Sequence, residues 1–347
     1  MVTQPNYGNW LSIDTLDSLD KYILFTMKEP WDILQSKITN KPHLINFNFN
    51  MEEIHLNILF QNLKSLVTDN YTIVGIGGGT AIDTAKYIYW MFRKEKNVNL
   101  DLILIPSIIS VDAFFCSSIA VRNDNKVNYI GESKPNEIII DYKLIQMAPL
   151  FFNRTGVSDT ISITSALGDW SLAKDENNER FNQDIFNRAK KIAMNLMNSR
   201  KEIKEVTEKG IKALVEGFYR EVTLCNDWGN ARPEEGSEHF LAYCLESLTR
   251  QHYLHGNLIG MNILISLYLQ EEYAEFSIED IKQFFDDINL NWTPSNQNIK
   301  NEEIIMALKA IVNYVTLEKL FYSIYNSPRL NLNQKKIFEI IDLINQK

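Results

Sequence analysis

The chain has 347 residues, of which 45% are hydrophobic and 23% charged, so it is long enough for two domains with packed cores. A formal net charge of −9 without a basic cluster disfavours a nucleic-acid-binding surface, although a small anionic substrate could still bind a local positive pocket. The three cysteines are widely spaced and form no disulfide framework, and no apolar run approaches the ~18 residues that span a bilayer. With no signal-peptide pattern at its start, a cytoplasmic protein without a membrane span is expected.

The first part of the chain alternates between strand-like and helix-like patterns. Short apolar or alternating runs at residues 21–26 and 43–48 predict strands, with a helix near residues 31–37 between them. Residues 51–66 have helical apolar spacing and lead to another strand pattern at residues 71–75. This β–α–β–α–β order implies an α/β domain with a mainly parallel sheet and helices on its faces.

A glycine-rich turn, Gly77-Gly78-Gly79-Thr80, follows this last strand and precedes a helix predicted over residues 81–92. Backbone N–H groups in such a turn can approach a phosphate, and the helix N-terminus adds a favourable partial charge, which suits a pyrophosphate. The pattern lacks the last glycine of the dinucleotide fingerprint, so a purely structural turn is the alternative interpretation.

A further buried strand, predicted at residues 100–105, ends in the loop 106–112. Functional loops lie at the carboxyl ends of parallel strands, so Asp112 is placed to hydrogen-bond a polyol; alternatively it is a turn residue or a helix cap. The runs 118–122 and 137–140 could form a hairpin or a sheet edge.

After Pro149 the pattern becomes almost continuously helical, and we place a domain boundary there. Residues 1–150 are predicted to form the α/β domain and residues 151–347 an all-α domain. Asp159 opens an apolar helical run at residues 161–172, and it could either cap that helix or supply a carboxylate to a metal site.

Three of the five histidines, His239, His252 and His255, lie within residues 236–256. Neutral imidazole is a common ligand for divalent metals, and catalytic sites typically take three protein ligands. An unbroken helix would separate His239 from His255 by about 24 Å, so the chain must turn between them, with each histidine near the start of one of two successive helices. Together with a carboxylate such as Asp159 they could bind a metal; the alternative is that they are ordinary surface or core-edge histidines.

Five motifs in matching order resemble the glycerol dehydrogenase, dehydroquinate synthase and iron-containing alcohol dehydrogenase superfamily, and within it the sn-glycerol-1-phosphate dehydrogenases. They are IVGIGGGTAIDTAK (73–86), PSIISVD (106–112), GVSDTISITSALGDWSLA (156–173), NARPEEGSEH (230–239) and LHG (254–256). The resemblance implies a dehydroquinate synthase-like fold in which the N-terminal α/β domain binds NAD or NADP. It also implies that the all-α C-terminal domain binds one divalent metal, zinc or alternatively nickel or iron, with the active site in the cleft between the domains.

The resemblance assigns roles to individual residues of this chain. The metal ligands would be Asp159, His239 and His255, and the catalytic residues Asp112, Asp159 and His255. The cofactor contacts would be Gly78, Gly79, Thr80, Asp83, Ser107, Ser110 and Cys116, and the substrate contacts Asp112, Arg122 and Tyr243. His252, three residues before His255, could share its helix face and join a proton relay.

Three positions depart from the family pattern. Ser158 stands in place of a glycine, Cys116 in place of a cofactor-contacting serine, and Tyr243 in place of a substrate-contacting histidine. Tyrosine keeps a hydroxyl group but cannot become cationic, which leaves the recognition of a substrate phosphate open. Arg122 aligns near a family lysine and could compensate.

The function that the resemblance implies is a metal-dependent, NAD(P)-linked oxidoreductase that interconverts a small ketone and a polyol. The metal would act as a Lewis acid while hydride passes to or from the nicotinamide, and the first-choice pair is dihydroxyacetone phosphate and sn-glycerol 1-phosphate. The alternatives are a glycerol dehydrogenase acting on unphosphorylated polyols, a sugar-phosphate cyclase, and a nonenzymatic relative with an altered site. A homodimer or higher homo-oligomer is expected from the family.

Overall fold

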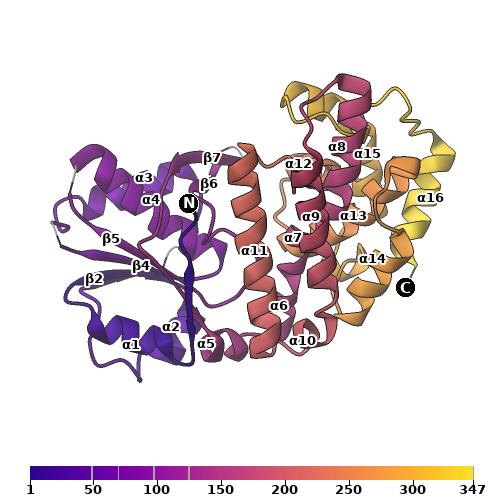
Figure 1. The fold of residues 1–347 in the computed structure, drawn as a ribbon. Helices are drawn as coiled ribbons and strands as arrows, with labels where there is room; N and C mark the ends of the chain where they lie inside the picture. The colour runs from indigo at the N-terminus through magenta and orange to yellow at the C-terminus, as the bar shows by residue number, and fades with distance from the viewer. Residues whose placement is uncertain (48–49, 69, 97, 124–125, 347) are drawn as a thin grey trace. The chain divides into compact units, whose positions relative to one another are not determined.

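The computed structural model describes residues 1–47, 50–68, 70–96, 98–123 and 126–346. The chain divides into two compact units, Met1–Asn153 and Arg154–Lys347. The first unit contains all the strands of the described residues, and the second is helical (Figure 1). This composition confirms the predicted fold class, an α/β part followed by an all-α part.

The first unit is built on a six-stranded sheet in which every neighbouring pair is parallel, in the order β1-β8-β5-β4-β2-β3. The strands of the unit are β1 (Pro5–Gly8), β2 (Tyr22–Thr26), β3 (Leu44–Asn46), β4 (Thr72–Gly77), β5 (Asp101–Pro106), β6 (Ser118–Asn123), β7 (Lys126–Glu132) and β8 (Glu137–Asp141). Its helices are α1 (Leu11–Ser18), α2 (Lys28–Leu34), α3 (Glu53–Leu63), α4 (Gly79–Lys96) and α5 (Tyr142–Met147), and α6 (Leu150–Thr155) spans the division between the units.

The sheet is covered on both faces, which explains why its central strands are almost continuously apolar rather than alternating. On β4, the side chains of Val74 and Ile76 belong to a core formed with residues of α1, α2 and α5. Gly75 and Gly77 point to the opposite face, where α4 packs on β2, β4 and β5.

Helix α4 approaches β4 so closely that a side chain does not fit between them. A Cβ atom on Gly75 would lie 2.8 Å from Cβ of Ala85, and one on Gly77 would lie 2.6 Å from Cβ of Ala81. These two glycines therefore have a packing role, and it brings the N-terminus of α4 directly to the carboxyl end of β4.

The strand order also creates a topological switch point. Strand β3 lies next to β2 on one side, and the following strand, β4, lies next to β2 on its other side. Crevices at the carboxyl ends of strands beside such a point are where open α/β sheets bind ligands. The glycine turn after β4 lies at this edge.

Two parts of the first unit differ from the sequence-based expectation. The runs 118–122 and 137–140 do not pair with each other: β6 forms an antiparallel hairpin with β7, and β8 is an inner strand between β1 and β5. The apolar Ile-Ile-Ile run of β8 suits that buried position, whereas β7, with its polar residues, had no clear strand pattern. Strand β1 and helix α1 were not predicted, because a four-residue strand containing proline and glycine gives almost no periodic signal.

Other boundaries moved by a few residues. The strand predicted at 43–48 forms over Leu44–Asn46, and residue 48 lies outside the described residues. The helix predicted near 31–37 begins earlier, at Lys28, because Pro30 is tolerated in its first turn.

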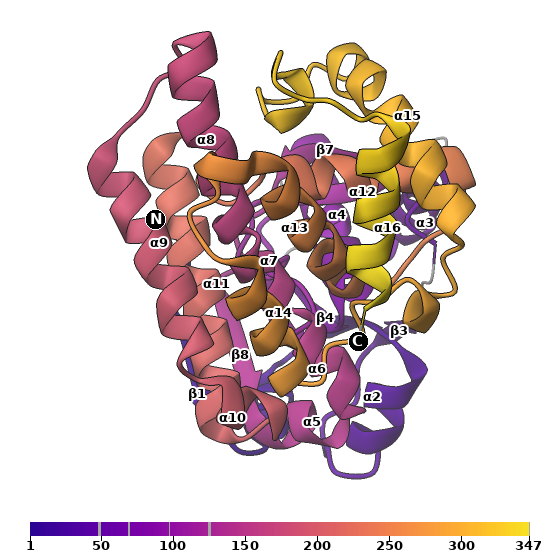
Figure 2. The same cartoon turned by 90° about the vertical axis from the view of Figure 1, so that its right-hand side faces the viewer.

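The second unit is an array of helices, which are labelled in Figure 2. They are α7 (Val157–Ile161), α8 (Ile163–Asn177), α9 (Gln183–Met197), α10 (Arg200–Lys204), α11 (Glu208–Trp228), α12 (Ser237–Thr249), α13 (His255–Gln270), α14 (Ile278–Asp287), α15 (Asn301–Leu317) and α16 (Gln334–Asn345). Three short 3₁₀ helices lie at Glu271–Tyr273, Ser295–Gln297 and Ile324–Asn326. Among the described residues, no helix combines the length and apolar character needed to cross a membrane.

Candidate functional site

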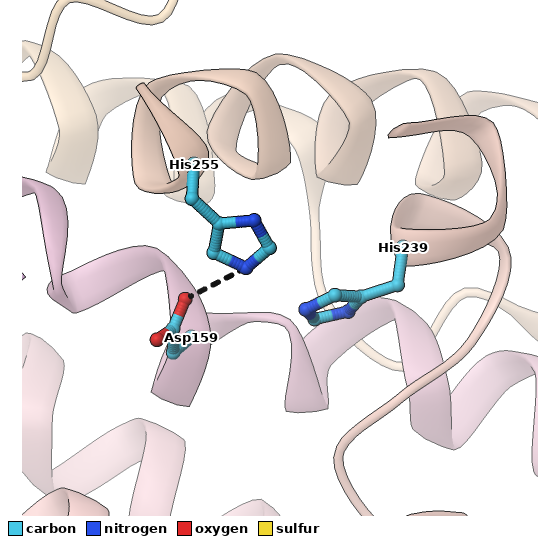
Figure 3. Close-up of side chains that lie close together, drawn as sticks. All are labelled: Asp159, His239 and His255. Atoms are coloured by element: carbon cyan, nitrogen blue, oxygen red, sulfur yellow. Dashed lines mark ion pairs between the residues drawn. The ribbon is translucent and has the colours of Figure 1, made fainter. Parts of the chain in front are cut away.

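Three side chains from separate helices converge in the second unit. Asp159 lies within α7, His239 is the third residue of α12, and His255 is the first residue of α13. Figure 3 shows the three side chains pointing toward one another. The histidines thus lie at the starts of two successive helices, as the sequence predicted.

The donor atoms of this cluster lie close enough to share one ion. One ligand atom from each of Asp159, His239 and His255 lies within 4.8 Å of the others. Nε2 of His255 is 3.4 Å from Oδ1 of Asp159, and the two imidazole centroids are 5.4 Å apart. Two imidazoles and one carboxylate form a donor set that suits Zn²⁺, Ni²⁺ or Fe²⁺, with a position left for a non-protein ligand.

Burial differs across the cluster. The side chains of Asp159 and His239 are 11% and 10% exposed, whereas the side chain of His255 is 39% exposed. An ordinary surface histidine would not have a buried carboxylate and a second imidazole beside it. The arrangement therefore fits a metal centre that is open on the side of His255.

His239 is hydrogen-bonded to its own neighbour in sequence. Its Nδ1 atom lies 2.9 Å from Oε1 of Glu238. Burial would lower the pKa of His239, but the hydrogen bond and negative charge of Glu238, with the charges of Glu235 and Asp159, raise this pKa to about 9.

The start of α13 is positioned by a close helix contact. A Cβ atom on Gly256 would overlap the carbonyl of Thr155, so only glycine lets α13 approach the chain just before α7. This contact holds His255 next to Asp159. Asp159 lies inside α7, and the N-cap residue of α8 is Ser162, so Asp159 is not the N-cap of that helix, the alternative left open by its sequence position.

The substitution at Ser158 is accommodated within the same packing. Ser158 is fully buried in α7, and Gly260 of α13 lies opposite it, where a Cβ atom would be 3.2 Å from the serine Oγ. The absence of a side chain at position 260 leaves room for the serine. The departure from the family glycine is therefore compatible with an intact cluster.

Tyr243 and His252 lie near the cluster in sequence but differ in setting. The Tyr243 hydroxyl donates a hydrogen bond of 2.8 Å to Oε1 of Glu235, and its ring centroid is 6.1 Å from that of His239. His252 is exposed in the non-helical segment between α12 and α13. The expectation that His252 shares a helix face with His255 was wrong, because α13 begins only at His255.

In the first unit, the predicted cofactor residues gather around the start of α4. Gly78 immediately precedes α4, and Gly79 and Thr80 are its first two residues. All three are partly exposed at this helix start, where backbone N–H groups lack helical partners. The N–H of Ser107 donates to the carbonyl of Gly77 at 3.0 Å, which joins the loop after β5 to the glycine turn. Ser110 is also close, since a Cβ atom on Gly78 would lie 3.9 Å from its Oγ.

Asp83 is in a different environment from these residues. It is 5% exposed, and its Oδ1 accepts a hydrogen bond of 2.7 Å from the fully buried Nζ of Lys86. The same Nζ donates to the carbonyls of Ala113 and Ser118. The pair thus anchors the segment that follows β5.

The remaining predicted residues lie on that segment and on the hairpin. Asp112 is partly exposed in the turn after β5, where its carbonyl accepts from the N–H of Phe115. The thiol of Cys116 donates to Oδ2 of Asp112 at 3.0 Å, so cysteine retains a donor at the position where the family has serine. Arg122 is partly buried on β6, and its N–H donates to the carbonyl of Met51.

Several known proteins are similar to this chain. The profile of the family described as iron-containing alcohol dehydrogenase matches residues 19–149. The chain is 28% identical over 267 residues to the glycerol-1-phosphate dehydrogenase [NAD(P)+] of Thermoplasma volcanium, covering 74% of this chain and 73% of that protein. It is 24% identical over 311 residues to the protein of the same name from Sulfurisphaera tokodaii, covering 86% of both. The chain is thus similar to iron-containing alcohol dehydrogenases over residues 19–149 and to glycerol-1-phosphate dehydrogenases over most of its length.

A solved structure shares the fold of almost the whole chain. The crystal structure of a probable glycerol dehydrogenase from Sinorhizobium meliloti 1021 superposes with a TM-score of 0.70 at 16% identity, covering 99% of this chain and 98% of that one. This likeness of fold agrees with the resemblance seen in the sequence motifs.

Sequence reasoning did not identify three buried polar residues that organise these regions. They are Lys86 in the first unit, and Glu238 and Asp169 in the second. All three lie within the motifs given above, but their roles depend on contacts that spacing does not encode. Asp169 accepts hydrogen bonds from the N–H groups of Ser237 and Ile324.

Proposed function

We propose that this protein is a metal-dependent, NAD(P)-linked dehydrogenase that interconverts a small ketone and a polyol. The observation that carries the proposal is the convergence of Asp159, His239 and His255 within 4.8 Å. Similarity to glycerol-1-phosphate dehydrogenases supports dihydroxyacetone phosphate and sn-glycerol 1-phosphate as the substrate pair.

In this proposal Asp159, His239 and His255 hold one divalent ion, zinc or alternatively nickel or iron. Such an ion supplies Lewis acidity at the oxygen of the substrate. The two neutral imidazoles and the single carboxylate neutralise only part of the positive charge of the ion. The exposure of His255 gives substrate access to that side of the cluster.

The first unit is proposed to bind the nicotinamide dinucleotide. The N–H groups of Gly78, Gly79 and Thr80 are suited to a pyrophosphate at the helix N-terminus and the switch point of the sheet. Ser107 and Ser110 add hydroxyl groups beside this turn, and Asp112 adds a carboxylate for a substrate hydroxyl. The Asp83 carboxylate is proposed to stabilise the loop through Lys86 rather than to contact the cofactor.

A second candidate function is a glycerol dehydrogenase acting on unphosphorylated polyols. It is favoured by the hydrogen bond between Tyr243 and Glu235, because this pair places an acid, rather than a cationic histidine, near the metal cluster. A carboxylate there would repel a phosphate but accept a hydrogen bond from a hydroxyl group.

The deciding experiment is NADH and NADPH oxidation by protein reconstituted with Zn²⁺, Ni²⁺ or Fe²⁺, with dihydroxyacetone phosphate and dihydroxyacetone side by side. A clear preference for the phosphate supports the main proposal, and mutation of Arg122 then tests its role. Preference for dihydroxyacetone supports the second candidate, and Tyr243→His should then shift the preference toward the phosphate. No turnover with either ketone would contradict both.

A further inference from the structure

Glu238 is a completely buried carboxylate in which both oxygens are engaged. Its Oε1 accepts a hydrogen bond of 2.7 Å from the N–H of Gly236 and lies 2.9 Å from Nδ1 of His239. Its Oε2 accepts a hydrogen bond of 2.7 Å from the Ser165 hydroxyl. A carboxylate with these partners has one fixed orientation.

This orientation decides which nitrogen of His239 carries a proton. Oε1 of an ionised carboxylate can only accept, so Nδ1 of His239 must be the N–H donor in their contact. The neutral ring then has its lone pair on Nε2. Figure 3 shows the imidazole of His239 pointing toward Asp159 and His255, so Nε2 is the atom available to the cluster.

We propose that Glu238 is a positioning residue for the metal centre: it fixes the His239 tautomer that presents Nε2 to the ion and raises the donor strength of that nitrogen. This inference rests on the metal site of the proposed function. Glu238 itself is not a ligand, because its oxygens are directed at Gly236, Ser165 and Nδ1 of His239.

The turn before α12 has a second anchor that does not touch His239. Oδ2 of Asp169 accepts a hydrogen bond of 2.7 Å from the N–H of Ser237, and the carbonyl of Asp169 accepts one of 2.8 Å from the buried Arg232. A Cβ atom on Gly236 would lie 2.6 Å from Oδ2 of Asp169, so this anchor packs tightly on the turn. Asp169 therefore offers a matched comparison that separates shaping the turn from acting on the imidazole.

The test compares Glu238→Gln with Asp169→Asn. Glutamine keeps the size of Glu238 and removes its charge, so we expect the dissociation constant for Zn²⁺, measured by competition with a chromophoric chelator, to rise about 10- to 100-fold. Asp169→Asn should lower the melting temperature of the metal-free protein while changing the Zn²⁺ dissociation constant by less than about threefold. Equal weakening by both variants, or an unchanged affinity in Glu238→Gln, would overturn the proposal.

A spectroscopic measurement on the unmodified protein keeps the proposal testable if Glu238→Gln does not fold. In ¹⁵N-histidine-labelled, zinc-loaded protein, we expect the His239 signals to show zinc on Nε2 and a hydrogen-bonded proton on Nδ1. Zinc on Nδ1 would overturn the role of Glu238. If the unmodified protein binds none of Zn²⁺, Ni²⁺ and Fe²⁺, the proposed function fails instead, so the two failures are distinguishable.

Discussion

Nε2 of His255 lies 3.4 Å from Oδ1 of Asp159, although the two residues belong to helices that are far apart in the sequence. Helix packing creates this pair: α7 lies against α13, with Gly256 close to Thr155 and Gly260 opposite Ser158. The cluster is therefore a property of the second unit's core and is not built by a single local motif.

Replacement of Asp159 by asparagine removes the carboxylate of the cluster and keeps its shape. We expect the affinity for Zn²⁺ to fall by more than the roughly 100-fold loss that is typical when a residue hydrogen-bonded to a metal ligand is replaced. Ketone reduction should be lost as well. Metal content after dialysis and chelator competition measure this effect. The control is Asp184→Asn on α9, whose side chain is 80% exposed; full metal content in Asp159→Asn would count against the site.

Metal binding should depend strongly on pH because of His239. The pKa of His239 is raised to about 9, because the interactions with Glu238, Glu235 and Asp159 outweigh the effect of burial. In metal-free protein at neutral pH this imidazole therefore carries a second proton and is cationic. A metal must displace that proton. The apparent dissociation constant for Zn²⁺ should therefore rise about tenfold from this group alone when the pH falls from 8 to 7. Chelator competition at both pH values measures it, and an affinity independent of pH would contradict the raised pKa.

The sequence predicted those features that depend on local periodicity. The strands before and after the glycine turn, and the positions of His239 and His255 at two helix starts, followed from apolar spacing and from the polar break between the helices. The same reasoning missed β7 and misplaced β8, because pairing partners in a sheet are chosen by burial and topology rather than by proximity in sequence.

The roles of Lys86 and Glu238 could not be predicted from spacing. Adjacent residues on a helix point in directions about 100° apart, so nothing in the sequence indicates that Glu238 reaches back to Nδ1 of His239. The contact also depends on the turn before α12, where the N–H of Gly236 donates to Oε1 of Glu238. Likewise, the resemblance marked Asp83 as a cofactor contact, whereas its carboxylate is paired with the buried Lys86.

Lys86→Met should destabilise the first unit. The substitution leaves the Asp83 carboxylate buried without its cation and removes the donor to the carbonyls of Ala113 and Ser118. Loss of one partner of a buried pair typically costs about 3–5 kcal/mol in the free energy of unfolding. Urea denaturation measures this cost.

The double variant Asp83→Asn/Lys86→Met is the informative control for that experiment. Neutralising Asp83 removes the unpaired charge, so the double variant should recover part of the stability lost by Lys86→Met. If the two substitutions were simply additive, the pair would not be energetically coupled.

Gly77→Ala tests whether the close approach of α4 to β4 holds the proposed dinucleotide site in shape. The new methyl group would lie 2.6 Å from Cβ of Ala81, and neither group can rotate away, so α4 must shift. Such overpacking should cost about 1–3 kcal/mol in the free energy of unfolding and weaken NADH binding, measured by fluorescence titration. Ala81→Gly removes the opposing methyl group at a cost of about 1 kcal/mol within a helix. The Gly77→Ala/Ala81→Gly protein should therefore bind NADH more tightly than Gly77→Ala, and its two substitutions should cost less together than the sum of their separate costs.

Gly79→Ala is the comparison in the same turn, since its methyl group would meet only Val111 Cγ2, at 3.2 Å, and the expected loss of stability is smaller. If Ala81→Gly restored neither stability nor NADH binding, the two glycines before α4 would have to serve a purpose other than helix packing.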